Sequence, residues 1–97
     1  MPNNEAVAAL SALALDSRLR AFKLLARVGG EGLPAGEIAR RLNLQQNTLS
    51  DHLQILARAG MITGERNSRS IIYRANPDAL TNLIEFLSAT IDESKHD

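Results

Sequence analysis

The segment from residue 44 to residue 74, LQQNTLSDHLQILARAGMITGERNSRSIIYR, carries the strongest structural signal in the chain. Within residues 46–59, Leu49, Leu53 and Leu56 recur at spacings of four and three, so at about 100° per residue they share one helix face. Gly60 supplies the break that ends this helix. Residues 61–65 and 70–74 then have the composition of two paired strands, with Asn67 and Ser68 expected at the tip of the hairpin.

The opposite face of the predicted helix is polar, with Asn47, Ser50, Asp51, Gln54 and Arg58 along it. Short hydrogen-bonding side chains on an exposed helix are suited to base edges in the major groove of DNA. The pattern is also compatible with an ordinary solvated helix surface. Asp51 would repel phosphates but could accept a hydrogen bond from a cytosine amine, so its role stays open.

A second helix is predicted directly before this one. Pro34 is suited to the helix start, residues 35–42 place Ile38, Ala39 and Leu42 inward, and Asn43 ends the segment. Two helices joined by a turn over residues 43–45, the second with a polar face, make a helix-turn-helix. The hairpin that follows would be its wing.

Three further helices complete the prediction. A short helix covers residues 5–14. The next helix along the chain begins where Asp16 or Ser17 can cap it and stops at Gly29 and Gly30. Pro77 opens the last helix, over residues 77–93, whose apolar stripe is longer than one small core needs and so predicts a second subunit. The inward residues expected in the first two helices are Ala6, Ala9, Leu10 and Leu13, then Leu19, Phe22, Leu25 and Ala26.

The fold class is therefore mostly α with a small β-hairpin, a winged helix-turn-helix. A chain of 97 residues supports a single core, so residues 1–97 form one domain. No stretch approaches the roughly 18 apolar residues that cross a bilayer, and the N-terminus lacks a basic leader segment, so we expect a cytoplasmic protein with no membrane partner. The absence of Cys excludes disulfides and thiolate metal ligands.

The formal net charge is zero, but the charges are segregated along the chain. Residues 17–76 hold ten Lys or Arg against four Asp or Glu, whereas the two ends hold one Lys against seven acids. A basic middle favours a nucleic-acid partner despite the neutral total. Solvating charges scattered over helix surfaces would give the same count, so both interpretations remain.

Four segments resemble the ArsR/SmtB family of winged-helix transcriptional repressors over nearly the whole chain. They are LDSRLRAFKLL from Leu15, LPAGEIARRLNL from Leu33, NTLSDHLQILARAGMI from Asn47 and ERNSRSIIY from Glu65. The resemblance implies a homodimer, packed through the first and last helices, that binds a palindromic operator in double-stranded DNA and is released by a signal. The dimer residues expected on this basis are Leu10, Leu13, Leu80, Leu83, Ile84, Leu87 and Ile91.

The resemblance also assigns roles in DNA binding. The family's base-facing positions fall on Gln46, Asn47 and Ser50, with His52 in its Ser-x-His-Leu pattern, although helical phase turns His52 toward the leucine stripe. Gln and Asn suit bidentate contacts with adenine, and wing arginines reach phosphates or the minor groove. Helical phase adds Gln54 and Arg58 to the same outward row. The expected DNA-binding residues are therefore Gln46, Asn47, Ser50, His52, Gln54, Arg58, Arg66 and Arg69.

The signal that would release DNA is not evident from the sequence. Thiolate-sensing relatives place ligands where this chain has Pro34 and Gly36, which cannot ligate. Zinc-sensing relatives place them at positions that correspond to Pro77, Ala79, Thr90 and Glu93, of which only Glu93 is a plausible ligand. We therefore expect no metal and no cofactor. The release of DNA would then depend on an organic ligand, on a partner protein, or on expression level and competition between DNA sites.

Two other classes of function compete with a DNA-binding regulator. An enzyme is not expected, because no phosphate-binding glycine loop or zinc motif is present. Ser50, Asp51 and His52 diverge by about 100° per residue on a helix and cannot converge as a triad. The alternative to a DNA-binding regulator is a winged-helix module that binds protein without operator-specific DNA binding, and a fold alone does not separate the two.

Overall fold

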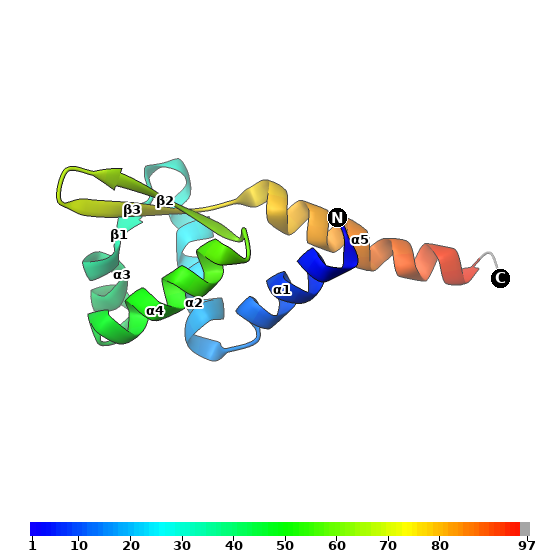
Figure 1. Cartoon of the computed structure of the whole chain (residues 1–97), viewed down its shortest axis with the longest axis horizontal. Coiled ribbons are helices and arrows are strands. Elements are labelled where there is room, and N and C mark those ends of the chain that lie inside the picture. The colour runs from blue at the N-terminus through cyan, green and yellow to red at the C-terminus, as the bar shows by residue number, and fades with distance from the viewer. Residues whose placement is uncertain (96–97) are drawn as a thin grey trace.

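Helices dominate the computed structural model, which describes the backbone of residues 1–95 and the side chains of residues 1–92 (Figure 1). The helix-turn-helix and a small sheet lie at one end, and α1 and α5 lie side by side toward the other. None of the described helices is long and apolar enough to span a membrane. The elements follow the order α1 (Asn3–Leu13), α2 (Asp16–Val28), η1 (Gly29–Glu31), β1 (Leu33–Pro34), α3 (Ala35–Leu42), α4 (Gln46–Arg58), β2 (Ile62–Asn67), β3 (Ser70–Ala75) and α5 (Pro77–Lys95).

The predicted leucine stripe of α4 is the centre of the core. Leu49, Leu53 and Leu56 are fully buried, and α2 packs against them with Phe22 and Leu25. Burying such a side chain removes its apolar surface from water, a gain of about 1.5 to 3 kcal/mol each. The stripe therefore fixes which face of α4 points outward.

The turn between α3 and α4 confirms the predicted helix-turn-helix. Asn43 ends α3 in the left-handed conformation (φ 56°, ψ 50°), and its backbone N–H donates to the carbonyls of Ala39 and Arg40. α4 begins three residues later at Gln46. The guanidinium of Arg20 on α2 donates to the Leu42 carbonyl at 3.0 Å, which holds the end of α3 against α2.

The sheet contains a strand that the sequence did not predict. Within the described residues it has three antiparallel strands in the order β1-β3-β2, and Leu33 of the two-residue β1 pairs with Tyr73. Gly32 permits this pairing, because its φ is +65° and a Cβ there would lie 2.5 Å from the Tyr73 carbonyl oxygen. A β-carbon at position 32 would separate β1 from the wing.

The tip of the wing differs from the prediction by one residue. Asn67 pairs with Ser70 as the last residues of β2 and β3, so the connecting residues are Ser68 and Arg69 and not Asn67 and Ser68. Ser68 takes the positive φ of 60° that tight hairpins require. Arg69 therefore lies within the tip itself.

The first two helices depart from the prediction in their caps and faces. α2 begins at Asp16 with Leu15 at the N-cap and no side-chain capping bond, so the cap predicted at Asp16 or Ser17 is wrong. Arg18 instead donates to the carbonyl of Ala12 at 2.7 Å and closes the end of α1. α1 buries Ala6, Ala9 and Ala12 while Leu10 is exposed, and α2 buries Ala21, Phe22 and Leu25 while Leu19 and Ala26 are exposed.

The apolar stripe of α5 divides into a buried and an exposed part. Leu83 is only 3% exposed, so it is a core residue of the protomer and has almost no surface left for a partner. Leu80 is half-buried against the core. Ile84, Leu87 and Ile91 are 54%, 44% and 61% exposed.

Candidate nucleic-acid interface

The outward face of α4 presents the polar side chains that the sequence placed there. Gln46, Asn47 and Gln54 are exposed and Ser50 is half-buried, while the leucines on the opposite side are completely covered. Amide and hydroxyl groups in this arrangement can donate and accept hydrogen bonds without first leaving the core. The helix is therefore held rigidly by one face and is free to bind with the other.

A hollow of about 250 Å³ joins the start of α4 to the wing. Gln46 and Ser50 line it from α4, and Arg69 lines it from the wing tip. Gly36 of α3 forms another wall, where a Cβ would lie 3.4 Å from the Gln46 amide oxygen. The structure thus brings together three of the expected DNA-binding residues, and the remaining lining residues are Pro34, Ala35, Ser70, Ile71 and Tyr73.

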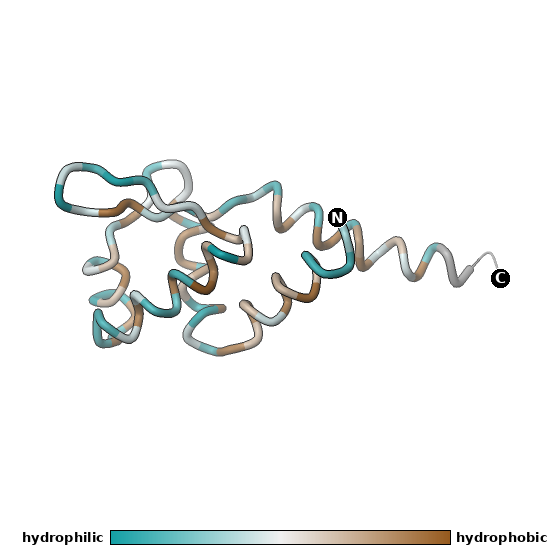
Figure 2. The backbone as a smooth tube through the Cα atoms, viewed as in Figure 1, coloured by the Kyte–Doolittle hydropathy of each residue, from teal (hydrophilic) through white to brown (hydrophobic). Residues whose placement is uncertain are grey.

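The wing exposes two arginines and holds a third in place. Arg66 lies on β2 opposite Ile71, and Arg69 lies in the tip; neither belongs to an ion pair in the described part of the chain. Arg74 donates to the Gly30 carbonyl at 2.8 Å and pairs with Glu65 at 3.3 Å. Figure 2 shows the hydrophilic residues along the outer part of the hairpin. Arg66 and Arg69 are the wing cations that remain available to an anion.

His52 is half-buried on α4, as helical phase predicted. Its Nδ1 atom is buried and finds no hydrogen-bond partner among the described residues. The ring therefore has one nitrogen turned into the protein, which sets His52 apart from the exposed amides of Gln46 and Asn47.

Arg58 lies at the opposite end of α4 from Gln46, roughly 18 Å away along the axis at 1.5 Å per residue. It is exposed and lines a shallow hollow of about 300 Å³ with Ala8, Ser11 and Ile55, between α1 and α4. The structure therefore does not bring Arg58 together with the residues at the start of the helix.

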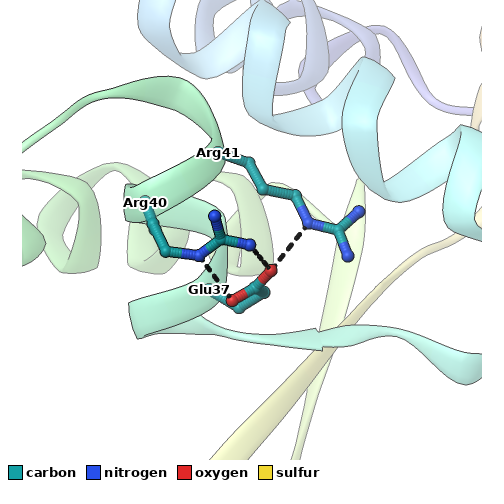
Figure 3. Close-up of polar contacts among 3 residues, drawn as sticks. All are labelled: Glu37, Arg40 and Arg41. Carbon is teal, nitrogen blue, oxygen red and sulfur yellow. Dashed lines mark hydrogen bonds and ion pairs between the residues drawn. The ribbon is translucent and has the colours of Figure 1, made fainter.

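A compact ion-pair network joins the first turn of α3 to its last turn (Figure 3). The Glu37 carboxylate accepts from Arg40 Nε at 3.0 Å and from Arg41 Nε at 2.9 Å, and it also accepts from Arg40 Nη2. Hydrogen bonds from Arg40 and then Arg41 lower the pKa of Glu37 from 4.5 to about 2, and the same carboxylate raises the pKa of Arg40. Sequence reasoning missed these pairs, although spacings of three and four on a helix could have predicted them.

Metal-ligating side chains do not gather in the described residues: no group of three or more His, Cys, Asp or Glu is found there. Pro34 and Gly36, to which the resemblance assigned the thiolate-ligand positions of relatives, line the hollow beside Gln46 without offering a donor side chain. The side chain of Glu93 lies outside the described residues.

Comparison with known proteins adds to this geometry. A family model described as a helix-turn-helix domain matches residues 8–65. The HTH-type transcriptional regulator NmtR of Mycobacterium tuberculosis is 31% identical over 87 residues, which cover 90% of this chain and 68% of that protein.

Solved structures show the same architecture. The AntR antimony-specific transcriptional repressor superposes with a TM-score of 0.69 at 32% identity, covering 97% of this chain and 83% of that one. The homodimeric winged helix-turn-helix DNA-binding domain of Mb0332 from Mycobacterium bovis superposes with a TM-score of 0.73 at 23% identity, covering 97% and 85%. The second likeness shows the fold alone.

Proposed function

The chain belongs to the ArsR/SmtB family of winged helix-turn-helix transcriptional regulators, and we propose that it represses transcription as a homodimer bound to a palindromic operator. Its family consists of DNA-binding transcriptional regulators and not of enzymes.

One observation carries the proposal most directly. Leu49, Leu53 and Leu56 are completely buried, while Asn47 and Gln54 on the same helix are exposed. A helix anchored in this way can enter a major groove, whose width of about 12 Å admits one α-helix, without unfolding any part of the core.

The start of α4 is the part proposed to contact bases. Asn47 and Gln46 can each form the bidentate hydrogen bonds that distinguish adenine, and Ser50 can contact a base or a phosphate. Gln54 and Arg58 extend the row toward the other end of the helix, and Arg58 is assigned to the backbone because of its charge. His52, with one ring nitrogen turned inward, is assigned a lesser contact.

The wing arginines are proposed to bind phosphates or the minor groove. Arg69 shares the hollow with Gln46 and Ser50, so a strand of DNA that meets the start of α4 also passes the wing tip. Arg66 lies farther along β2 and is proposed to extend this contact. Such contacts position the protein on the duplex without selecting its sequence.

The dimer is proposed to form through α1 and α5. Leu10 on α1 and Ile84, Leu87 and Ile91 on α5 leave apolar surface exposed. The two helices that carry these residues lie side by side (Figure 1). Leu13 and Leu80 are half-buried and would complete the contact. A two-fold axis through this surface would place two copies of α4 on two halves of a palindrome.

The release signal is proposed to act without thiol chemistry, because the chain contains no Cys. The antimony specificity in the description of AntR is a property of AntR and is not assigned to this chain. For this chain an organic ligand, a partner protein or a change in expression level could each shift the equilibrium between free and DNA-bound dimer.

Titration with duplex DNA at two salt concentrations tests the proposal. DNA selected by the purified protein from a random pool supplies the operator, and a scrambled duplex is the control. Binding through about six phosphates predicts a loss of affinity of roughly 10³-fold between 50 and 200 mM salt. A weak, salt-insensitive response that is equal for both duplexes would favour the protein-binding module instead.

A further inference from the structure

Several basic side chains lie together where α2 meets α3. They have no role in the DNA contacts proposed for α4 and the wing. Arg20, Lys23 and Arg27 lie at spacings of three and four along α2, so they share one face of that helix. Together with Arg41 of α3 they line a hollow of about 270 Å³. We call this surface, formed by Arg20, Lys23, Arg27 and Arg41, the α2–α3 basic patch.

The counter-charges near the patch neutralise only part of it. Asp16 lies 3.9 Å from Arg20 and its side chain is 85% exposed, so this pair is weak. Glu37 is shared between Arg41 and Arg40. Lys23 and Arg27 take part in none of the ion pairs found among the described residues. Like charges one helix turn apart repel each other, and an anionic partner would relieve that repulsion.

The position of the patch points to the same partner as α4. Arg20 donates to the Leu42 carbonyl at 3.0 Å, and Arg41 precedes the turn at Asn43 that leads into α4. The patch therefore begins beside the turn of the helix-turn-helix and continues along α2. A polyanion held by Gln46 and Asn47 already meets Arg69 of the wing, and the patch would supply further cations beyond the turn.

We propose that the α2–α3 basic patch binds backbone phosphates of the DNA that flanks the operator. This inference rests on the proposed DNA binding by α4. Arg20 and Arg27 are separated by about 10 Å along the helix axis at 1.5 Å per residue. One DNA strand carries a phosphate about every 3.4 Å of its axis, so the patch matches the length of about three phosphates. The contact adds affinity and contributes no sequence preference.

The double variant Lys23→Gln/Arg27→Gln tests this assignment. Both side chains are exposed, and glutamine keeps a helix-compatible chain while it removes the charge. Dissociation constants are measured for two duplexes: the selected operator trimmed to its sequence-specific bases, and the same operator with about ten random base pairs added to each side. Circular dichroism before titration establishes that each variant is folded.

The matched control is Asn3→Asp/Asn4→Asp. It lowers the net charge by the same amount at exposed positions in the first turn of α1, where acidic side chains are favourable. A loss of affinity caused only by total charge would appear equally in this control.

The wild-type protein is expected to bind the flanked duplex more tightly than the trimmed one, by about tenfold or more, and Lys23→Gln/Arg27→Gln is expected to lose most of that gain. Its salt slope on the flanked duplex should fall by about 0.9 for each phosphate that the variant no longer neutralises. The assignment would be overturned if the flanking base pairs raised the affinity of wild type and variant by the same factor. It would also be overturned if the variant lost the same factor of affinity on both duplexes. The trimmed duplex tests the proposed function separately from the patch. If the wild-type protein does not bind the trimmed operator specifically, the proposed function itself is refuted.

Discussion

The side-chain amide of Asn76 donates a hydrogen bond of 3.1 Å to the carbonyl of Gly60, and so joins the end of α4 to the start of α5. The backbone N–H of Asn76 also donates to the Met61 carbonyl at 2.9 Å, and its side-chain oxygen accepts from the N–H of Ala79 at 3.4 Å. One residue thereby connects the helix proposed to bind DNA with the helix proposed to form the dimer.

Asn76→Ala is expected to lower the free energy of unfolding by roughly 1 to 2 kcal/mol, because it removes both a helix cap and a link to the Gly60 carbonyl. Urea unfolding followed by circular dichroism measures the change. Asn76→Asp is the comparison variant, since it keeps the capping oxygen and replaces the amide donor to the Gly60 carbonyl by a charged oxygen that cannot donate. An Asn76→Ala protein as stable as wild type would show that the network contributes nothing.

The helix-turn-helix was predictable because its signals are local. Leucine spacing identified α4 and its buried face, Asn43 marked the end of α3, and Gly60, with its φ of +80°, marked the end of α4. Each of these depends on a residue and its neighbours within one turn of chain. The exposed polar row followed from the same periodicity.

Other features depend on contacts between distant segments. β1 has only two residues and no periodicity of its own, and it exists because Leu33 pairs with Tyr73. The burial of Leu83 and the exposure of Leu19 depend on where neighbouring helices cross, which spacing does not specify. The Asn76 cap could have been recognised, since Asn followed by Pro77 is a common helix start.

The arrangement of the proposed DNA-binding residues was predictable only in part. The outward row of α4 followed from helical phase, whereas the proximity of Arg69 to Gln46 and Ser50 required the hairpin to be placed over the start of α4. The α2–α3 basic patch depends likewise on α2 lying beside the end of α3.

Arg69→Ala is expected to weaken binding to operator and scrambled duplexes by the same factor, because a wing arginine on a phosphate carries no sequence information. The slope of log affinity against log salt should decrease by about 0.9 for each phosphate that Arg69 neutralises in the wild-type complex. Fluorescence anisotropy at several salt concentrations gives both quantities. Weaker binding confined to the operator would instead assign Arg69 to a base.

Leu87→Asp is expected to yield a folded monomer, because Leu87 is 44% exposed in the protomer and a charge there would be buried only in the dimer. Analytical ultracentrifugation reports the association state, and circular dichroism reports folding. Ala89→Asp adds the same charge at an exposed position of α5 roughly 160° around the helix from Leu87 and should remain dimeric. A stable dimer in Leu87→Asp would place the interface elsewhere.

The Glu37 network predicts a defined pH dependence. The folded-state pKa of Glu37 is lowered from 4.5 to about 2, so its stabilising contribution is complete above pH 4.5 and is lost as the pH falls toward 2. Wild type should therefore exceed Glu37→Gln in stability at pH 7, and the difference should shrink between pH 4.5 and 2. Urea unfolding of both proteins across this range measures it. A difference that stays constant down to pH 2 would contradict the assigned pKa.

The most direct measurement of the central claim is the affinity of Asn47→Ala for the selected operator, for its single-base variants and for scrambled DNA. Loss of a bidentate contact from the exposed face of α4 predicts about 1 to 3 kcal/mol weaker operator binding, relaxed preference at one base pair in each half-site, and unchanged binding to scrambled DNA. An Asn47→Ala protein that binds the operator with wild-type affinity and wild-type preference would show that this face of α4 does not contact the bases.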